Sequence, residues 1–100
     1  MQVQVIRSGG FAAITQQAVV DAPELDPRER EELARLIDTT AFFDLPDAIE
    51  TPNGAFDQFH YEITVRAPER RHTVAVGDGG ISLELYELAR FVFLFGRRGG

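Results

Sequence analysis

The chain has 100 residues, with 16 acidic residues against 10 basic ones, and a formal net charge of −6 at pH 7. This acidic balance argues against nucleic acid and against an anionic membrane surface as partners, because the average field of the protein repels polyanions. The lack of cysteine excludes disulfides, thiolate metal sites and a cysteine nucleophile. With 44% hydrophobic residues, we expect one domain over residues 1–96 and a flexible tail at 97–100.

The beginning of the chain lacks the features of a signal peptide. Polar and apolar residues alternate from Gln2 to Val5, with neither a basic n-region nor an apolar h-region. The most apolar run, 91–95, is far shorter than the roughly 20 residues of a membrane span. We therefore expect a cytoplasmic protein.

The first predicted element is a β-hairpin. Val3 and Val5 alternate with glutamines, which is typical of a half-buried strand. Ser8, Gly9 and Gly10 follow and supply positions that tolerate a positive φ, as a tight connection requires. The return strand is expected from about Ala12 to Val20.

A helix is predicted next. Asp26 is a good N-cap, Pro27 suits the first helical position, and Glu29 completes a capping box. We expect the helix to run to about Asp38, with an apolar stripe on one side and a favourable i,i+4 pair on the other. The stripe consists of Leu33, Leu36 and Ile37, with Thr40 one turn further on. The pair consists of Glu31 and Arg35.

The segment after this helix combines an apolar plug with a long loop. Phe42, Phe43 and Leu45 precede a proline and are expected to close the core. Residues 46–57 contain two prolines and an Asn-Gly, so they form the longest irregular stretch expected. Long irregular segments often carry function.

A second hairpin has the clearest strand pattern of the chain. Apolar and polar residues alternate from Phe59 to Val65, and a turn over 67–70 would pair Arg66 with Arg71. This register places the valines of the return strand, which ends at Val76, on the apolar side, and a one-residue slip would expose them.

A last helix, capped by Ser82, should end at Gly96. Its apolar stripe is expected to contain Ile81, Leu85, Leu88, Ala89, Val92 and Phe95. The order ββαββα predicts an α+β fold with a four-stranded antiparallel sheet and both helices packed on one face.

Few residues could support catalysis or metal binding. His60 and Glu62 share the polar face of one strand near Asp57, but a zinc site requires three or four ligands, so a polar sheet face is favoured. His72 is expected inside, near a strand end, with one hydrogen bond. The chain has only two serines, each explained by a turn or a cap. We expect no catalytic residue, no metal site and no cofactor.

Two further groups have simple structural explanations. Gly77, Asp78, Gly79 and Gly80 lack the lysine and the spacing of phosphate-binding loops, so a flexible exit from the hairpin is favoured. The arginines at 66, 70 and 71 are expected on a solvated turn.

The last helix carries apolar residues outside its stripe, at Leu83, Tyr86, Phe93 and Leu94. Partial cover by the 42–45 segment is favoured. A homodimer, or another partner bound through the remaining patch, stays open as an alternative.

Four segments together resemble one protein family. They are Arg7-Ser8-Gly9-Gly10-Phe11-Ala12, Phe42-Phe43-x-Leu45-Pro46, Asp57-x-Phe59-x-Tyr61-x-Ile63-Thr64-Val65 and Arg70-Arg71-His72-Thr73-Val74-x-Val76-x-Asp78. Their order and spacing, from about Val3 to Val92, resemble the emfourin family, small bacterial protein inhibitors of thermolysin-like (M4) zinc metalloproteases. The chain departs from the family in its Ala67-Pro68-Glu69 turn, where members are glycine-rich, and in its aromatic ending.

The resemblance implies a non-enzymatic inhibitor that blocks the substrate cleft of such a protease, whose metal belongs to the enzyme. The first candidate contact is the turn of Ser8, Gly9, Gly10 and Phe11, with Phe11 as an apolar anchor; alternatively, Phe11 folds back onto the core. The second is the loop containing Asp47, Glu50, Asn53 and Gly54, for which a merely solvated acidic loop is the alternative. An interaction module that uses its last helix is the alternative function.

Overall fold

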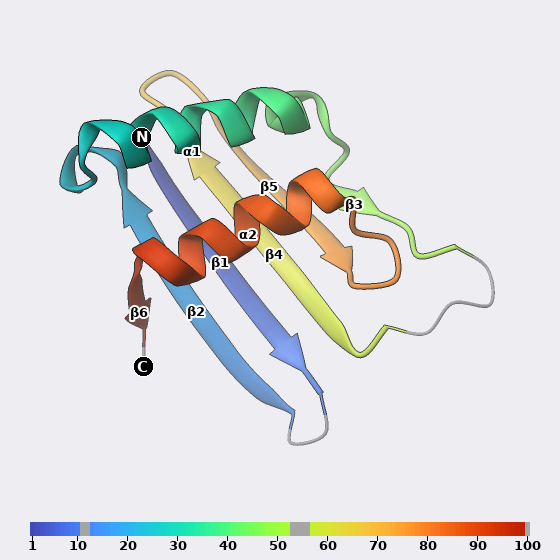
Figure 1. Ribbon diagram of the computed structural model, residues 1–100. Coiled ribbons are helices and arrows are strands. Elements are labelled where there is room, and N and C mark those ends of the chain that lie inside the picture. The colour runs from blue at the N-terminus through green and yellow to red at the C-terminus, as the bar shows by residue number, and fades with distance from the viewer. Residues whose placement is uncertain (11–12, 53–56, 100) are drawn as a thin grey trace.

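The computed structural model describes residues 1–10, 13–52 and 57–99 (Figure 1). Phe11, Asn53 and Gly54, which were singled out above, lie outside the described residues. The elements in chain order are β1 (Gln2–Gly9), β2 (Ile14–Asp21), η1 (Ala22–Glu24), α1 (Pro27–Thr40), η2 (Phe42–Asp44), β3 (Ala48–Ile49), β4 (Phe59–Arg66), β5 (Arg71–Gly77), α2 (Leu83–Phe95) and β6 (Arg97–Gly99).

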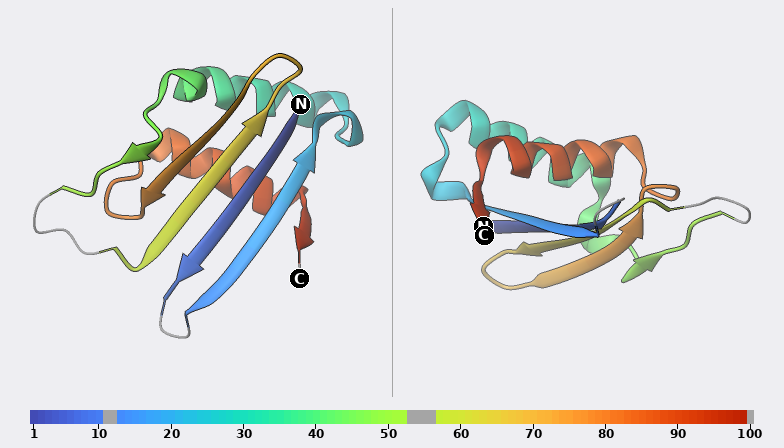
Figure 2. Two further views of the ribbon diagram at one scale, coloured as in Figure 1. Left: turned by 180° about the vertical axis from the view of Figure 1, so that it is seen from behind. Right: turned by 90° about the horizontal axis from the view of Figure 1, so that it is seen from below.

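The α+β class and the packing of both helices on one face of the sheet are confirmed, as Figure 2 shows from below. The predicted number of strands was wrong. The sheet has six strands in the order β3-β5-β4-β1-β2-β6, and it is mixed, because β3 runs parallel to β5.

Both additional strands are short edge strands that alternation cannot reveal. β3 has two residues and lies within the expected loop at 46–57. β6 lies within the expected flexible tail, where Arg97 pairs with Val19 of β2 in an antiparallel register. Arg97 also forms an ion pair with Asp21 at the end of β2, which helps to hold this arginine-rich segment on the sheet.

The strand registers agree with the hydrophobic pattern. In the β4–β5 hairpin, Arg66 pairs with Arg71 and Ile63 with Val74, as predicted. β1 lies between β2 and β4, and its Val3 and Val5 are completely buried. The helix-facing side of the sheet therefore supplies one wall of the core.

Helix α1 begins as predicted and ends two residues later than predicted. Asp26 accepts a hydrogen bond from the Glu29 amide at 2.8 Å, and the Glu29 carboxylate accepts one from the Asp26 amide, so the capping box is complete. At the other end, Ala41 adopts a left-handed conformation with φ of 48°. This turn ends the helix after Thr40.

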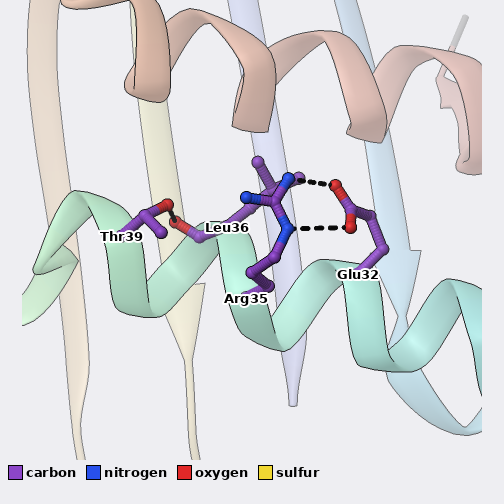
Figure 3. Close-up of polar contacts among 4 residues, drawn as sticks. All are labelled: Glu32, Arg35, Leu36 and Thr39. Atoms are coloured by element: carbon purple, nitrogen blue, oxygen red, sulfur yellow. Dashed lines mark hydrogen bonds and ion pairs between the residues drawn. The ribbon is translucent and has the colours of Figure 1, made fainter.

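The expected pair of Glu31 and Arg35 on α1 was wrong. Arg35 instead binds Glu32 through two hydrogen bonds, Nε to Oε2 at 3.0 Å and Nη2 to Oε1 at 2.5 Å (Figure 3). This contact and the negative charge of Glu32 raise the pKa of Arg35, and Glu87 on α2 adds a smaller effect in the same direction. Arg35 therefore pairs with the preceding turn of α1 at position i−3 instead of i−4.

The plug after α1 is confirmed. Phe42 is 1% exposed, and its ring meets those of Phe43 and His72 at centroid distances of 6.0 and 5.7 Å. His72 is partly buried as expected, and its Nε2 lies 2.7 Å from the Leu45 carbonyl oxygen. The plug thus fastens the end of α1 to β5.

Helix α2 is capped by Ser82, whose hydroxyl accepts a hydrogen bond from the Leu85 amide. Its predicted inner stripe was right from Leu85 to Val92 and wrong at both ends, since Ile81 lies before the cap. Phe95 is 47% exposed, whereas Phe91, which sequence analysis did not assign to the stripe, is buried. The centroids of the two rings lie 4.7 Å apart, and both rings line the groove between α1 and α2.

Candidate functional site: a clamped loop end of the sheet

Three connections meet at the end of the sheet where β1 ends and β4 begins (Figure 1). They are the β1–β2 turn, the segment that precedes β4, and the β5–α2 turn. Their described meeting point, here named the loop end, consists of Gly9, Gly10, Thr51, Asp57, Gln58 and 77–80. The structure therefore joins the two segments that sequence analysis proposed separately as partner contacts, and adds a third.

Backbone hydrogen bonds tie these connections together. The Gly10 amide donates to the Gln58 carbonyl at 2.8 Å, and the Asp78 amide donates to the Phe59 carbonyl at 3.0 Å. The Gln58 amide in turn donates to the Asp78 carboxylate at 3.0 Å. Gln58 is thus linked to the first turn through its carbonyl and to the third through its amide.

The glycines of the first turn are required by the close approach of the backbone. Gly9 and Gly10 have φ of 113° and 81°, which confirms the expected positive values. A Cβ atom on Gly9 would lie 2.4 Å from the Gln58 carbonyl oxygen, well inside any real contact. Only glycine satisfies both the dihedral angle and the space at this position.

Asp57 is the central side chain of the loop end. Its Oδ1 accepts a hydrogen bond from the Gly79 amide at 2.8 Å, and its Oδ2 accepts one from the Thr51 hydroxyl. The Thr51 hydrogen bond, then that of Gly79, and the nearby His60 lower the pKa of Asp57. Because both oxygens are engaged inside the chain, Asp57 acts as a clamp between two connections.

The clamp also explains Gly77. A Cβ atom at this position would lie 2.2 Å from Cγ of Asp57, so only a glycine leaves room for the carboxylate. Sequence analysis named Asp57 as a neighbour of His60 and Glu62 and interpreted 77–80 as a flexible exit, without connecting the two. The sequence signals were the Asp-Gln before β4 and the Gly-Asp-Gly-Gly that begins at the last residue of β5. That these two segments meet depends on the register of the hairpin.

The other predicted contact residues are separated by the structure. Ser8 is half-buried opposite His60 on β4, and Glu50 is exposed beside Gly80 of the loop end. Asp47 lies elsewhere, along the β3–β5 edge: its carbonyl accepts from the Ala75 amide at 2.8 Å, and its carboxylate lies 3.7 Å from Nδ1 of His72.

Charge divides the two ends of the sheet. The loop end carries the carboxylates of Asp57 and Asp78, with Glu50 beside it, while the arginines at 66, 70 and 71 gather at the opposite end of the β4–β5 hairpin. Arg7 on β1 is held in place by two aromatic rings: its guanidinium lies 5.1 Å from the centroid of Phe59 and 5.4 Å from that of Phe93. Arg70 covers the Phe43 ring at 4.0 Å, so the expected solvated turn is partly packed.

The helix-free face of the sheet has a shallow groove of about 320 Å³ next to the loop end. Ile6, Ser8, His60, Glu62 and Ala75 contribute to its lining. Within 1–10, 13–52 and 57–99, no group of three or more His, Cys, Asp or Glu side chains could hold a metal ion. The groove thus presents a mixed polar surface without a ligand cluster.

A second surface lies on the outer side of α2, facing away from the sheet. Leu83, Tyr86 and Leu94 are 68%, 43% and 60% exposed. Phe93, which was grouped with them, is instead half-buried, with Arg98 at 4.9 Å on its ring in addition to Arg7. The expected cover by the 42–45 segment was wrong, because η2 packs on α1 and β5. Two arginines cover Phe93 instead.

The family model described as Emfourin matches residues 5–92 of the chain. Comparison with curated proteins and with solved structures gave no match. None of the helices in the described part of the chain is long and apolar enough to cross a membrane.

Proposed function

The chain belongs to the Emfourin family, and we propose that it inhibits a thermolysin-like (M4) zinc metalloprotease by binding at the substrate cleft through the loop end. The family is one of protease inhibitors, which agrees with a role in binding rather than in catalysis. The zinc ion in this proposal belongs to the protease.

The observation that carries the proposal is the clamping of three connections at one end of the sheet. An inhibitor binds tightly when its contact loops are ordered before association, because little conformational entropy is then lost. The hydrogen bonds of Asp57 and Gln58 order the flanks of the β1–β2 turn and of the segment before β4. β1 and β2 also extend beyond the helix layer where β1 ends and β2 begins, so a cleft could receive this part of the sheet (Figure 1).

Two side chains are assigned contact roles in this proposal. Phe11, which lies outside the described residues, stands between Gly10 and the β2 strand and supplies the apolar anchor. Glu50 is exposed and its backbone lies beside Gly80 of the loop end, whereas Asp57 is already occupied by Thr51 and Gly79. A catalytic zinc keeps one open ligand position, to which an exposed carboxylate could bind.

Inhibition kinetics test the proposal. Purified protein is titrated against a panel of thermolysin-like proteases and unrelated zinc proteases, with a peptide substrate. We expect slow-dissociating inhibition, competitive with substrate, of at least one thermolysin-like member. Absence of inhibition across the panel by folded protein would refute the proposal.

A pair of truncations locates the contact. Phe11→Ala is expected to weaken inhibition by about 100-fold, as for a buried aromatic anchor at an interface. Leu94→Ala removes an equally apolar side chain that is 60% exposed at the far end of α2, and should leave inhibition unchanged. Equal losses in both variants would contradict the assignment to the loop end.

A second candidate function is favoured by the exposure of Leu83, Tyr86 and Leu94: an interaction module that binds a partner through α2. It predicts that changes on α2 abolish the biological interaction and that changes at the loop end do not. The Phe11→Ala and Leu94→Ala pair therefore separates the two functions.

A further inference from the structure

We propose that α2 packs antiparallel against α2 of a second copy of this chain, forming a two-fold symmetric dimer. This proposal concerns the outer surface of α2 and does not depend on protease inhibition. The dimer would leave the loop end of each copy outside the helix interface.

The outer surface of α2 has the spacing of a helix-pairing seam. Leu83, Glu87, Arg90 and Leu94 follow one another at intervals of four, three and four residues, so they form one stripe along the exposed side of the helix. Intervals of three and four are those of the a and d positions in coiled coils. Tyr86 and the exposed edge of Phe93 border the stripe on one side.

This stripe is complementary to itself only when the second helix runs in the opposite direction. A two-fold axis between positions 88 and 89 places Leu83 against Leu94 of the second copy at both ends. The same axis places Glu87 against Arg90 of the second copy, twice. A parallel pair would instead place Glu87 beside Glu87 and Arg90 beside Arg90, and like charges in a seam are unfavourable.

The charges of the stripe are available for such pairing. Among the residues that the structure describes, neither Glu87 nor Arg90 has an ion-pair partner in its own chain, in contrast to Arg35 and Glu32 on α1. The flanking leucines are 68% and 60% exposed. Charged pairs placed between the leucine contacts fix the register of helix pairing, at some cost in affinity.

The length of the stripe determines how tightly the dimer is expected to form. α2 has 13 residues, so the seam is about 20 Å long. One helix face of this length buries less than the roughly 800 Å² per partner of a standard stable interface. We therefore expect a dissociation constant of about 10–100 µM.

Sedimentation equilibrium with exchanged charges tests the dimer. Arg90→Glu and Glu87→Arg each create two like-charge contacts, so each should raise the dissociation constant more than about 10-fold. The double variant restores opposite charges and should return the constant to within about 3-fold of the original. Arg28→Glu and Glu31→Arg, the same changes at exposed positions of α1, are the matched controls and should change little.

Cysteine cross-linking tests the direction of pairing, since the chain contains no cysteine of its own. A mixture of Leu83→Cys and Leu94→Cys proteins under mild oxidation should yield mainly the mixed disulfide. Predominant like-with-like disulfides would contradict the antiparallel arrangement. Two results would overturn the dimer. One is a chain that stays monomeric up to about 1 mM, and the other is a double variant that dimerises no more tightly than either single variant.

Discussion

The loop end and the outer surface of α2 are built from opposite kinds of interaction. At the loop end, amides, carbonyls and the Asp57 carboxylate are bound to one another within the chain before any partner arrives. On α2, apolar side chains remain exposed and two opposite charges remain unpaired among the described residues. The loop end can therefore gain affinity from preorganisation, while α2 gains it by removing apolar surface from water.

The largest expected effect comes from Gly9→Val. The added side chain would collide with the Gln58 carbonyl and would require a φ near 113° that valine does not adopt. We expect inhibition to fall by more than about 100-fold and the free energy of unfolding to fall by about 3 kcal/mol. Enzyme inhibition and urea denaturation measure the two effects.

Ala75→Val is the control for this change, because it places the same final side chain at an exposed position of β5. Its free energy of unfolding should change by less than about 0.5 kcal/mol. A Gly9→Val protein with unchanged stability and inhibition would show that the first turn is not fixed by Gln58.

A smaller effect is expected from Gly77→Ala. The new methyl group would displace the Asp57 carboxylate, so inhibition should weaken by about 10-fold through loss of order in the loops. In an Asp57→Ala background the same change should have almost no effect, because there is no carboxylate left to displace. Additive effects in this double-mutant cycle would argue against the clamp.

The clamp also predicts a pH dependence. Because the hydrogen bonds from Thr51 and Gly79 lower the pKa of Asp57 in the folded state, they stabilise the fold above the ordinary aspartate pKa of about 3.9. This stabilisation is lost as the pH falls through the lowered pKa. The difference in free energy of unfolding between the protein and Asp57→Asn should thus be constant from pH 7 to about pH 5 and shrink below pH 4.

Chemical denaturation across this pH range measures that difference. Asp44→Asn, at an exposed acidic residue of η2, is the matched control and should show no such change. If the difference in free energy of unfolding between the protein and Asp57→Asn grew at acid pH, it would contradict the stabilising hydrogen bonds to the Asp57 carboxylate.

The smallest expected effect is an increase in the free energy of unfolding, at a position outside both the loop end and the outer surface of α2. Ala41 ends α1 with φ of 48°, a conformation that glycine adopts more easily. Ala41→Gly should raise the free energy of unfolding by about 0.5–1 kcal/mol and leave inhibition and dimerisation unchanged. Ala34→Gly, in the exposed middle of α1, should lower it by about 1 kcal/mol, and thermal denaturation compares the two.

Sequence reasoning worked where a local pattern specifies the result. Alternation fixed the β4–β5 register, and Asp26 and Ser82 identified both helix starts. It failed where the result depends on contacts between distant segments. β3 and β6 are too short to show alternation, and the ion pair of Arg97 with Asp21 joins positions 76 residues apart.

In the candidate site too, sequence analysis found the feature that a local pattern specifies and missed the one that depends on distant contacts. The Ser8 to Gly10 turn was found from its glycines, whose positive φ values are a local property. The role of Asp57 could not be found in this way, because Thr51 and Gly79 reach it from two different connections. Phe95 was expected in the buried stripe of α2, but Phe91 is buried there and Phe95 is exposed. A helical wheel drawn for α2 alone cannot predict this, because it leaves out α1, which packs beside α2.

The most direct test of the loop end as the inhibitory surface is amide NMR of labelled protein titrated with an inactive thermolysin-like protease. We expect the signals of Gly10, Gln58 and Gly79 to shift or broaden, and those along α2 from Leu85 to Val92 to remain unchanged. Changes confined to α2, with the loop-end signals unaffected, would contradict the account.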